Sequence, residues 1–290
     1  MSGVFYEESK GTGSPVIFLP GLGWPGGMGK NVADELMPDF HTYLLDLPGI
    51  GRSDSLRGTL FFADMGDWVA RVLDELGLSS AHLIGHSMGA AMALAAARKH
   101  PERVRSLVLL DGGFRSVPRF PNAAGPLRYI APLLDWADRL GSPLRRRKHG
   151  FANPVKEKAS PARSDEEVAK DIKLALERGW YGLADDSYLR HACEYSPNTS
   201  AASLRLMLAL YRTNVPKELL QVQVPTFLLY GTRAHGEERE QAEVERHIKL
   251  VRKCRPDISL LPVEWGHYVH WAPTPVTPYI REFLIKHEES

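Results

Sequence analysis

The residues around Ser87 form a sequence pattern that is typical of a nucleophilic serine. This serine is the central residue of the pentapeptide 85–89, which reads Gly-His-Ser-Met-Gly, with the apolar run 81–84 before it and the small residues 90–97 after it. This order predicts a strand, a tight turn that carries the serine, and then a helix. Such a turn holds the serine hydroxyl clear of the sheet, and the helix start directs backbone N–H groups at the group under attack. The pattern therefore predicts Ser87 as the nucleophile of a covalent reaction.

A serine hydroxyl is a weak nucleophile at neutral pH and needs a base, usually a histidine oriented by a carboxylate. His267 follows the last strand that we predict, 258–263, and in open α/β sheets sites form at the carboxyl ends of the strands. We therefore expect His267 to be the base. His270 stays an alternative if the loop has a different register. By alternation along its strand His86 points away from the serine, and we expect it to orient or pack against other groups.

The elements that must position these residues alternate between strands and helices. Further buried strands are predicted at 16–19, 42–47, 105–110 and 224–231, a short first strand at 4–8, and helices at 29–37, 63–76, 237–253 and 277–286. Such an alternation is typical of an α/β fold with a doubly wound, mostly parallel sheet.

The pattern changes between the predicted strands 105–110 and 224–231. Prolines are frequent there, no long buried strand is evident, and helices are predicted at 132–140 and 165–178. The apolar run 204–211 is expected to be buried against the sheet domain. A stretch of about 110 residues is too long for a structureless loop. We therefore predict a core made of residues 1–114 and 222–290, and an inserted helical cap, or lid, made of residues 115–221. The basic run 145–148 is interpreted as a solvated helix end.

Composition narrows the functional class. A chain of 290 residues that is 43% hydrophobic suits one large domain or a domain with an insertion. Its formal net charge of +1 favours neither nucleic acid nor an acidic membrane as partner. Cys193 and Cys254 are too far apart for a metal or redox motif. No secretory signal pattern and no apolar run of about 20 residues is evident. We expect a cytoplasmic protein without a membrane span, a metal or a cofactor.

Taken together, the motifs resemble those of the α/β-hydrolase fold family with an inserted cap, of the esterase, lactonase and carbon–carbon hydrolase type. The resemblance covers nearly the whole chain outside the cap and rests on the segments 19–23, 46–53, 85–89 and 266–267. It implies an oxyanion hole formed by the backbone N–H groups of Leu22 and Met88. The corresponding loop of the family usually begins His-Gly; here Pro20 replaces the histidine, which removes neither donor. By the same resemblance Asp46 is structural.

The expected acid is where the sequence departs from the family. In many relatives the strand before the long charged helix ends in Gly-x-x-Asp, but here the run 231–234 ends in Ala234. In some branches of the fold the acid follows the preceding strand, which favours Asp111, with two glycines after it. Glu237 or Glu238 reaching back to the histidine remains an alternative, as does the lack of an orienting acid.

These residues predict a serine hydrolase that cleaves carboxylic esters through an acyl-enzyme on Ser87. The same triad would serve a carbon–carbon or amide hydrolase or an acyltransferase, and a non-catalytic binding protein of the same fold stays a further alternative. The resemblance argues against haloalkane dehalogenases and epoxide hydrolases, which carry an aspartate at this turn. A pocket between cap and sheet would have aromatic walls, so a small to medium apolar substrate is expected. Candidate wall residues are Trp24, Phe114, Tyr129, Trp136, Trp180 and Tyr181. The oligomeric state stays open, with a homodimer as one alternative.

Overall fold

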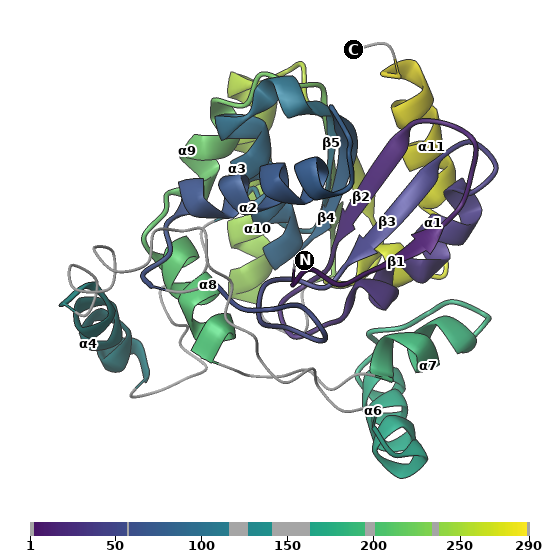
Figure 1. Cartoon of the computed structure of the whole chain (residues 1–290), viewed down its shortest axis with the longest axis horizontal. Helices are drawn as coiled ribbons and strands as arrows, with labels where there is room; N and C mark the ends of the chain where they lie inside the picture. The colour runs from purple at the N-terminus through teal and green to yellow at the C-terminus, as the bar shows by residue number, and fades with distance from the viewer. Residues whose placement is uncertain are drawn as a thin grey trace.

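A seven-stranded sheet forms the centre of the part of the chain that the computed structural model describes, residues 3–56, 58–115, 127–140, 163–194, 201–233 and 238–288 (Figure 1). In chain order the strands are β1 (Tyr6–Ser9), β2 (Pro15–Leu19), β3 (His41–Leu45), β4 (Ala81–His86), β5 (Val104–Leu110), β6 (Thr226–Gly231) and β7 (Ser259–Val263). Their order across the sheet is β1-β3-β2-β4-β5-β6-β7, and every neighbouring pair is parallel except β1 with β3. The predicted fold class, a doubly wound and mostly parallel sheet, is confirmed.

The strands end together at one edge of the sheet. Leu19 pairs with Gly85 where β2 meets β4, and His86 pairs with Leu110 where β4 meets β5. Chain order reverses between β2 and β4, because β3 lies on one side of β2 and β4 on the other. In sheets of this kind the crevice at the reversal is where ligands bind. The loops after β2, β4, β5 and β7 therefore meet at this edge.

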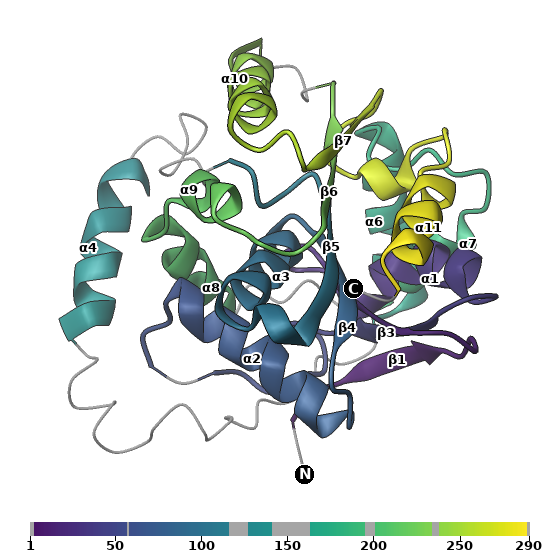
Figure 2. The same cartoon turned by 90° about the horizontal axis from the view of Figure 1, so that it is seen from above.

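Two layers of helices cover the sheet (Figure 2). On one face lie α2 (Phe62–Glu75), α3 (Met88–Lys99), α9 (Val215–Leu220) and α10 (Glu238–Cys254), and on the other α1 (Lys30–Leu36) and α11 (Thr277–Lys286). Short 3₁₀ helices are η1 (Gly26–Gly29), η2 (Pro101–Arg103) and η4 (Val269–Trp271). Side chains of the strands alternate between the two cores: in β2, Ile17 and Leu19 pack with the first layer and Val16 and Phe18 with the second. The central strands β2, β4, β5 and β6 are consequently buried on both faces, whereas β1 and β7 are partly exposed.

The described residues between β5 and α9 form helices and connecting loops and contain no strand. These helices are α4 (Leu127–Leu140), α6 (Asp165–Glu177), α7 (Ser187–Cys193) and α8 (Ala201–Tyr211). Helices α4 and α8 lie on the side of α2 and α3, whereas α6 and α7 lie on the side of α1 and α11 (Figures 1 and 2). The cap boundaries 115–221 stay a prediction, and the basic run 145–148 lies outside the described residues.

Two details differ from the sequence prediction. The helix expected at 132–140 begins five residues earlier, at Leu127, and contains Pro132 in its interior, where a proline was expected to mark the start. The short helices α7 and α9 were not predicted, because six or seven residues carry too little periodicity to be recognised. Among the described helices none is both long and apolar enough to cross a lipid bilayer.

Candidate active site

Ser87 lies in the turn between β4 and α3 with φ at 52° and ψ at −109°. In the described part of the chain Ser87 and Asp111, with φ at 43°, are the two residues other than glycine with positive φ. This left-handed region is unfavourable for a residue with a Cβ, so the surroundings must hold the backbone there. They do so through hydrogen bonds: the Ser87 N–H donates to Leu110 O at 3.1 Å, and the Gly89 N–H donates to Pro20 O at 3.0 Å.

Glycines allow the neighbouring loops to approach the serine turn. A Cβ on Gly89 would lie 2.0 Å from the carbonyl oxygen of Leu19, and a Cβ on Gly112 would lie 2.6 Å from that of Ser87. Both contacts are backbone contacts that a side chain could not relieve. Within the turn itself, a Cβ on Gly85 would lie 2.4 Å from the carbonyl oxygen of Gly89, so both glycines of the Gly-x-Ser-x-Gly pattern allow close backbone contacts.

A histidine and a carboxylate meet at the same edge of the sheet. Nδ1 of His267, which follows β7, lies 2.6 Å from Oδ2 of Asp111, which follows β5. The other carboxylate oxygen, Oδ1, accepts the N–H of Gly231 at 3.0 Å, and Nη2 of Arg115 lies 3.5 Å from Oδ2. Because a carboxylate accepts, the shared proton belongs to Nδ1, which leaves Nε2 of the neutral ring with its lone pair. The Asp111 side chain is only 5% exposed, whereas that of His267 is 28% exposed.

Of the alternative site residues from the sequence, the structure describes the side chain of His270 alone. Glu237 and the side chain of Glu238 lie outside the described residues. His270 is buried in η4, and burial, together with the nearby His267, lowers its pKa to about 3. Among the described hydrogen bonds, Asp111 pairs with His267 and not with His270.

The two predicted oxyanion donors stand on neighbouring strand ends. Leu22 follows β2 and Met88 opens α3, directly after Ser87. Neither amide donates a hydrogen bond within the described chain, and the first residue of a helix has no acceptor inside it. The loop that carries Leu22 is shaped by a hydrogen bond from Trp24 N–H to Gly21 O at 3.1 Å. The oxyanion role of the Leu22 and Met88 N–H groups stays a prediction.

Aromatic side chains gather around the histidine loop. Trp24 lies edge-on to Tyr268 and to Trp271, with ring centroids 5.9 Å and 5.3 Å apart, and its Nε1–H donates to the Tyr268 hydroxyl at 3.3 Å. The Trp180 ring lies 5.4 Å from that of Tyr268, and the buried Tyr181 packs 5.3 Å from Trp271. Three of the predicted wall residues are therefore brought together. Sequence reasoning did not single out Tyr268 and Trp271, although the segment 265–271 is rich in aromatic residues.

The other predicted wall residues are placed apart from this cluster. Phe114 has no exposed surface and packs in the core on the α2 and α3 side of the sheet. Trp136 is 60% exposed on α4, and the side chain of Tyr129 lies outside the described residues. In the described contacts, neither Phe114 nor Trp136 touches the rings around the histidine loop.

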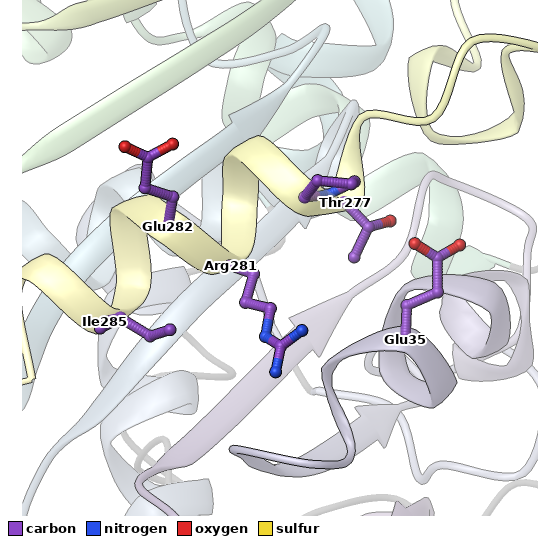
Figure 3. Close-up of a pocket in the computed structure, with 6 residues that line it drawn as sticks. Glu35, Thr277, Arg281, Glu282 and Ile285 are labelled. Carbon is purple, nitrogen blue, oxygen red and sulfur yellow. The ribbon is translucent and has the colours of Figure 1, made fainter.

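A surface pocket lies elsewhere, between α1 and α11 (Figure 3). It is lined by Glu35, Thr277, Pro278, Arg281, Glu282 and Ile285. None of the predicted site residues lines it. Within the described ranges, no group of three or more histidine, cysteine, aspartate or glutamate side chains is arranged to hold a metal ion.

The chain is similar in sequence to known proteins. A family model described as alpha/beta hydrolase fold matches residues 14–272. The chain is 29% identical over 269 residues to N-formylmaleamate deformylase of Pseudomonas putida, which covers 92% of this chain and 86% of the relative. It is 40% identical over 116 residues to 2-hydroxy-6-oxononadienedioate/2-hydroxy-6-oxononatrienedioate hydrolase of Burkholderia vietnamiensis, covering 38% of this chain and 40% of that relative.

A solved structure has the same fold. A thermophilic esterase from Thermogutta terrifontis superposes with a TM-score of 0.66 at 22% identity and covers 98% of this chain and 94% of its own. At that identity the similarity concerns the fold alone. The first of the curated relatives are matched over about two fifths of their own length.

Proposed function

Because the chain belongs to the α/β-hydrolase fold family, we propose that it is a serine hydrolase that cleaves carboxylic esters of small to medium apolar substrates. The observation that carries the proposal is the 2.6 Å contact between His267 Nδ1 and Asp111 Oδ2. It joins residues 156 positions apart, at the sheet edge where Ser87 occupies a turn with positive φ. A histidine oriented by a buried carboxylate is the base that activates a serine hydroxyl in a catalytic triad.

In the proposed reaction the serine hydroxyl adds to the carbonyl carbon of the ester. His267 Nε2 takes the proton of Ser87 Oγ as the C–O bond forms, and Asp111 stabilises the imidazolium. The N–H groups of Leu22 and Met88 donate to the oxyanion of the tetrahedral intermediate. The intermediate collapses to the acyl-enzyme when His267 returns the proton to the leaving alcohol. Water then attacks the acyl-enzyme by the same steps and releases the acid.

The apolar substrate class is supported by the aromatic side chains near the proposed site. Trp24 lies two residues after the proposed oxyanion donor Leu22, and Tyr268 directly follows the proposed base. Both rings are partly exposed, and Trp180, from the segment after α6, lies against Tyr268. Such rings contribute apolar contact area to a bound acyl group or alcohol. We propose that the helices between β5 and β6 form the cap over this region.

Amide hydrolysis is the second candidate. The relative whose match spans 92% of this chain is a deformylase of N-formylmaleamate. An amide nitrogen leaves only after protonation, which His267 could provide in the same position. The proposed triad is unchanged, so the two activities differ in the groups that surround the leaving group.

The nucleophile is tested by covalent labelling. A fluorophosphonate probe reacts with activated serines, so the wild-type protein is expected to be labelled on Ser87 and Ser87→Ala to remain unlabelled. Ser79→Ala, an exposed serine before β4, is the matched control and should be labelled like wild type. Equal labelling of wild type and Ser87→Ala, with both folded, would contradict the proposal and favour a non-catalytic binding protein.

The bond specificity is tested on matched substrates. The wild-type enzyme, not treated with the probe, is assayed on p-nitrophenyl esters of increasing acyl length and on N-formyl amides. A higher kcat/KM on the esters, rising with apolar acyl length, is the expected result. A kcat/KM that is higher on the formyl amides, and lost in Ser87→Ala, would replace ester cleavage by amide cleavage.

A further inference from the structure

We propose that His86, the residue before the nucleophile, is a positioning residue that fixes the backbone of His267 by donating a hydrogen bond from its Nε2–H to the His267 carbonyl oxygen. The proposal rests on the proposed function, in which His267 is the base. It assigns a role to the second residue of the Gly-His-Ser-Met-Gly turn that packing alone does not explain.

The contact spans 181 residues of sequence. His86 Nε2 lies 3.0 Å from His267 O, and the centroids of the two rings are 4.7 Å apart. The ring of His86 also stacks on that of Tyr268, at 5.3 Å, and lies 4.9 Å from that of His270. His86 is 1% exposed. Its ring thus lies directly beneath the loop that carries the proposed base.

The hydrogen bond fixes the tautomer of His86. A carbonyl oxygen only accepts, so Nε2 must carry the proton and Nδ1 of the neutral ring has none. Within the described chain Nδ1 has no hydrogen-bond partner. It faces Gly21 instead, where a Cβ would lie 2.8 Å away. The ring is therefore confined between the loop after β2 and the loop after β7.

The surroundings keep His86 neutral. The titratable groups that face His86 are the imidazoles of His267 and His270 and the phenol ring of Tyr268. Burial first, and then the charges of His267 and His270, lower the pKa of His86 well below 6.5. Burial also raises the pKa of Tyr268. A neutral donor keeps its hydrogen bond when the neighbouring His267 takes up a proton, because it adds no second positive charge.

The position of His86 in the sheet explains how it can position the backbone of His267. His86 is the last residue of β4, paired opposite Leu110 of β5, and Ser87 follows it directly. The nucleophile and the donor to the His267 backbone therefore extend from consecutive residues of one central strand. Any displacement of that strand end moves both together, which preserves the distance between hydroxyl and imidazole. Misplacement of a reacting group by about 1 Å can lower a rate about a hundredfold.

The donor is tested with a pair of variants. His86→Phe keeps a buried ring without a donor, and kcat on a nitrophenyl ester is expected to fall about ten- to a hundredfold while KM changes little. His86→Gln carries an amide N–H in place of Nε2–H and is expected to recover most of kcat. His82→Phe is the matched control: His82 is also fully buried in β4, bonds Ser106 Oγ at 2.8 Å, and should leave kcat unchanged.

A second measurement does not depend on turnover. The pH titration of the His267 ring, followed by NMR in the Ser87→Ala background, is expected to shift in His86→Phe and to return in His86→Gln. A folded His86→Phe protein with wild-type kcat and titration would overturn the proposal, as would equal losses in the Phe and Gln variants. If the wild type shows no hydrolysis and no serine labelling while the titration still responds, the proposed function fails and the positioning role stands.

Discussion

At the scale of single residues, the proposed site coincides with local backbone strain. Ser87 and Asp111 both adopt positive φ, at 52° and 43°, although neither is glycine. Such conformations cost on the order of 1 to 3 kcal/mol each and persist only where surrounding contacts impose them. For Asp111 those contacts come from β6, because its N–H donates to Leu229 O at 2.8 Å and its Oδ1 accepts from Gly231. The strained turn directs the carboxylate towards His267.

The orienting role of Asp111 leads to a kinetic prediction. In Asp111→Asn the amide can no longer hold the proton on His267 Nδ1, so kcat on a nitrophenyl ester is expected to fall about 10⁴-fold, with residual activity from the oxyanion donors. The control is the double variant Glu237→Gln, Glu238→Gln, which should keep wild-type kcat. A loss of several orders of magnitude in the glutamate variant alone would refute the assignment of Asp111.

At the scale of elements, the helix that starts at the serine is held against its neighbour by a glycine. Gly66 of α2 faces α3, and a Cβ there would lie 2.6 Å from the carbonyl oxygen of Ala95. The contact is with backbone, so no side chain can rotate away. The run of alanines in α3 is buried along its length. Close approach of α2 and α3 fixes the helix whose first residue is Met88.

This contact predicts that the usual preference of helices for alanine reverses at one position. Gly66→Ala is expected to lower the free energy of unfolding by about 1 to 3 kcal/mol, because the methyl group would push α2 away from α3. Urea denaturation measures the change. At the exposed Ala63 of the same helix, Ala63→Gly is the control and should cost up to about 1 kcal/mol through helix propensity alone. Greater stability of Gly66→Ala would show that the helices can separate without cost.

At the scale of the whole molecule, the first strand is joined to a helix far along the chain. Glu7 of β1 lies 2.7 Å from Nε2 of His191 in α7, 184 residues later, and 2.8 Å from Nη2 of Arg52. Nδ1 of His191 lies 3.3 Å from Glu194. The His191 ring also packs against Gly27: a Cβ on this glycine would lie 2.8 Å from the ring. These contacts anchor α7 beside the loop that follows β2.

The protonation of this pair makes stability depend on pH. Burial alone would raise the pKa of Glu7, but hydrogen bonds from His191 and Arg52 outweigh it and lower that pKa to about 2. The pKa of His191 is raised, first by its hydrogen bond to Glu7. The Glu7 contribution is therefore present above its unfolded pKa and is lost as the pH falls towards 2. The His191 contribution is complete below its unfolded pKa and is lost as the pH rises through its folded pKa.

A variant of the histidine tests this dependence. His191→Gln is expected to destabilise the protein by about 1 kcal/mol at pH 6 and by less at pH 9, as measured by urea denaturation at both values. His287 serves as a control of opposite sign, because burial lowers its pKa. Protonation of His287 disfavours the folded state, so the stability lost in His287→Gln should be smaller at pH 5 than at pH 9. An equal effect of His191→Gln at both pH values would contradict the ion pair.

Local patterns determined the fold class and the core elements of this protein. The strands and the main helices follow from short-range periodicity, and the serine turn follows from the glycines on either side of the serine. The structure has these elements within a few residues of the predicted bounds. The short helices α7 and α9 were not predicted, because one or two helical turns give almost no periodic signal in the sequence. The start of α4 was misplaced because a proline is ordinarily excluded from helix interiors.

Only the tertiary structure decided which groups meet at the strand ends. The sequence left Asp111, Glu237 and Glu238 open as partners of the histidine, because the choice depends on strand order and not on local pattern. The strand order β5-β6-β7 brings Asp111, which follows β5, to 2.6 Å from His267, which follows β7, across 156 residues. The same packing brings Trp24 to Tyr268 and His86 to the backbone of His267. Contacts at such separations are set by the folding of the whole sheet, which no short segment encodes.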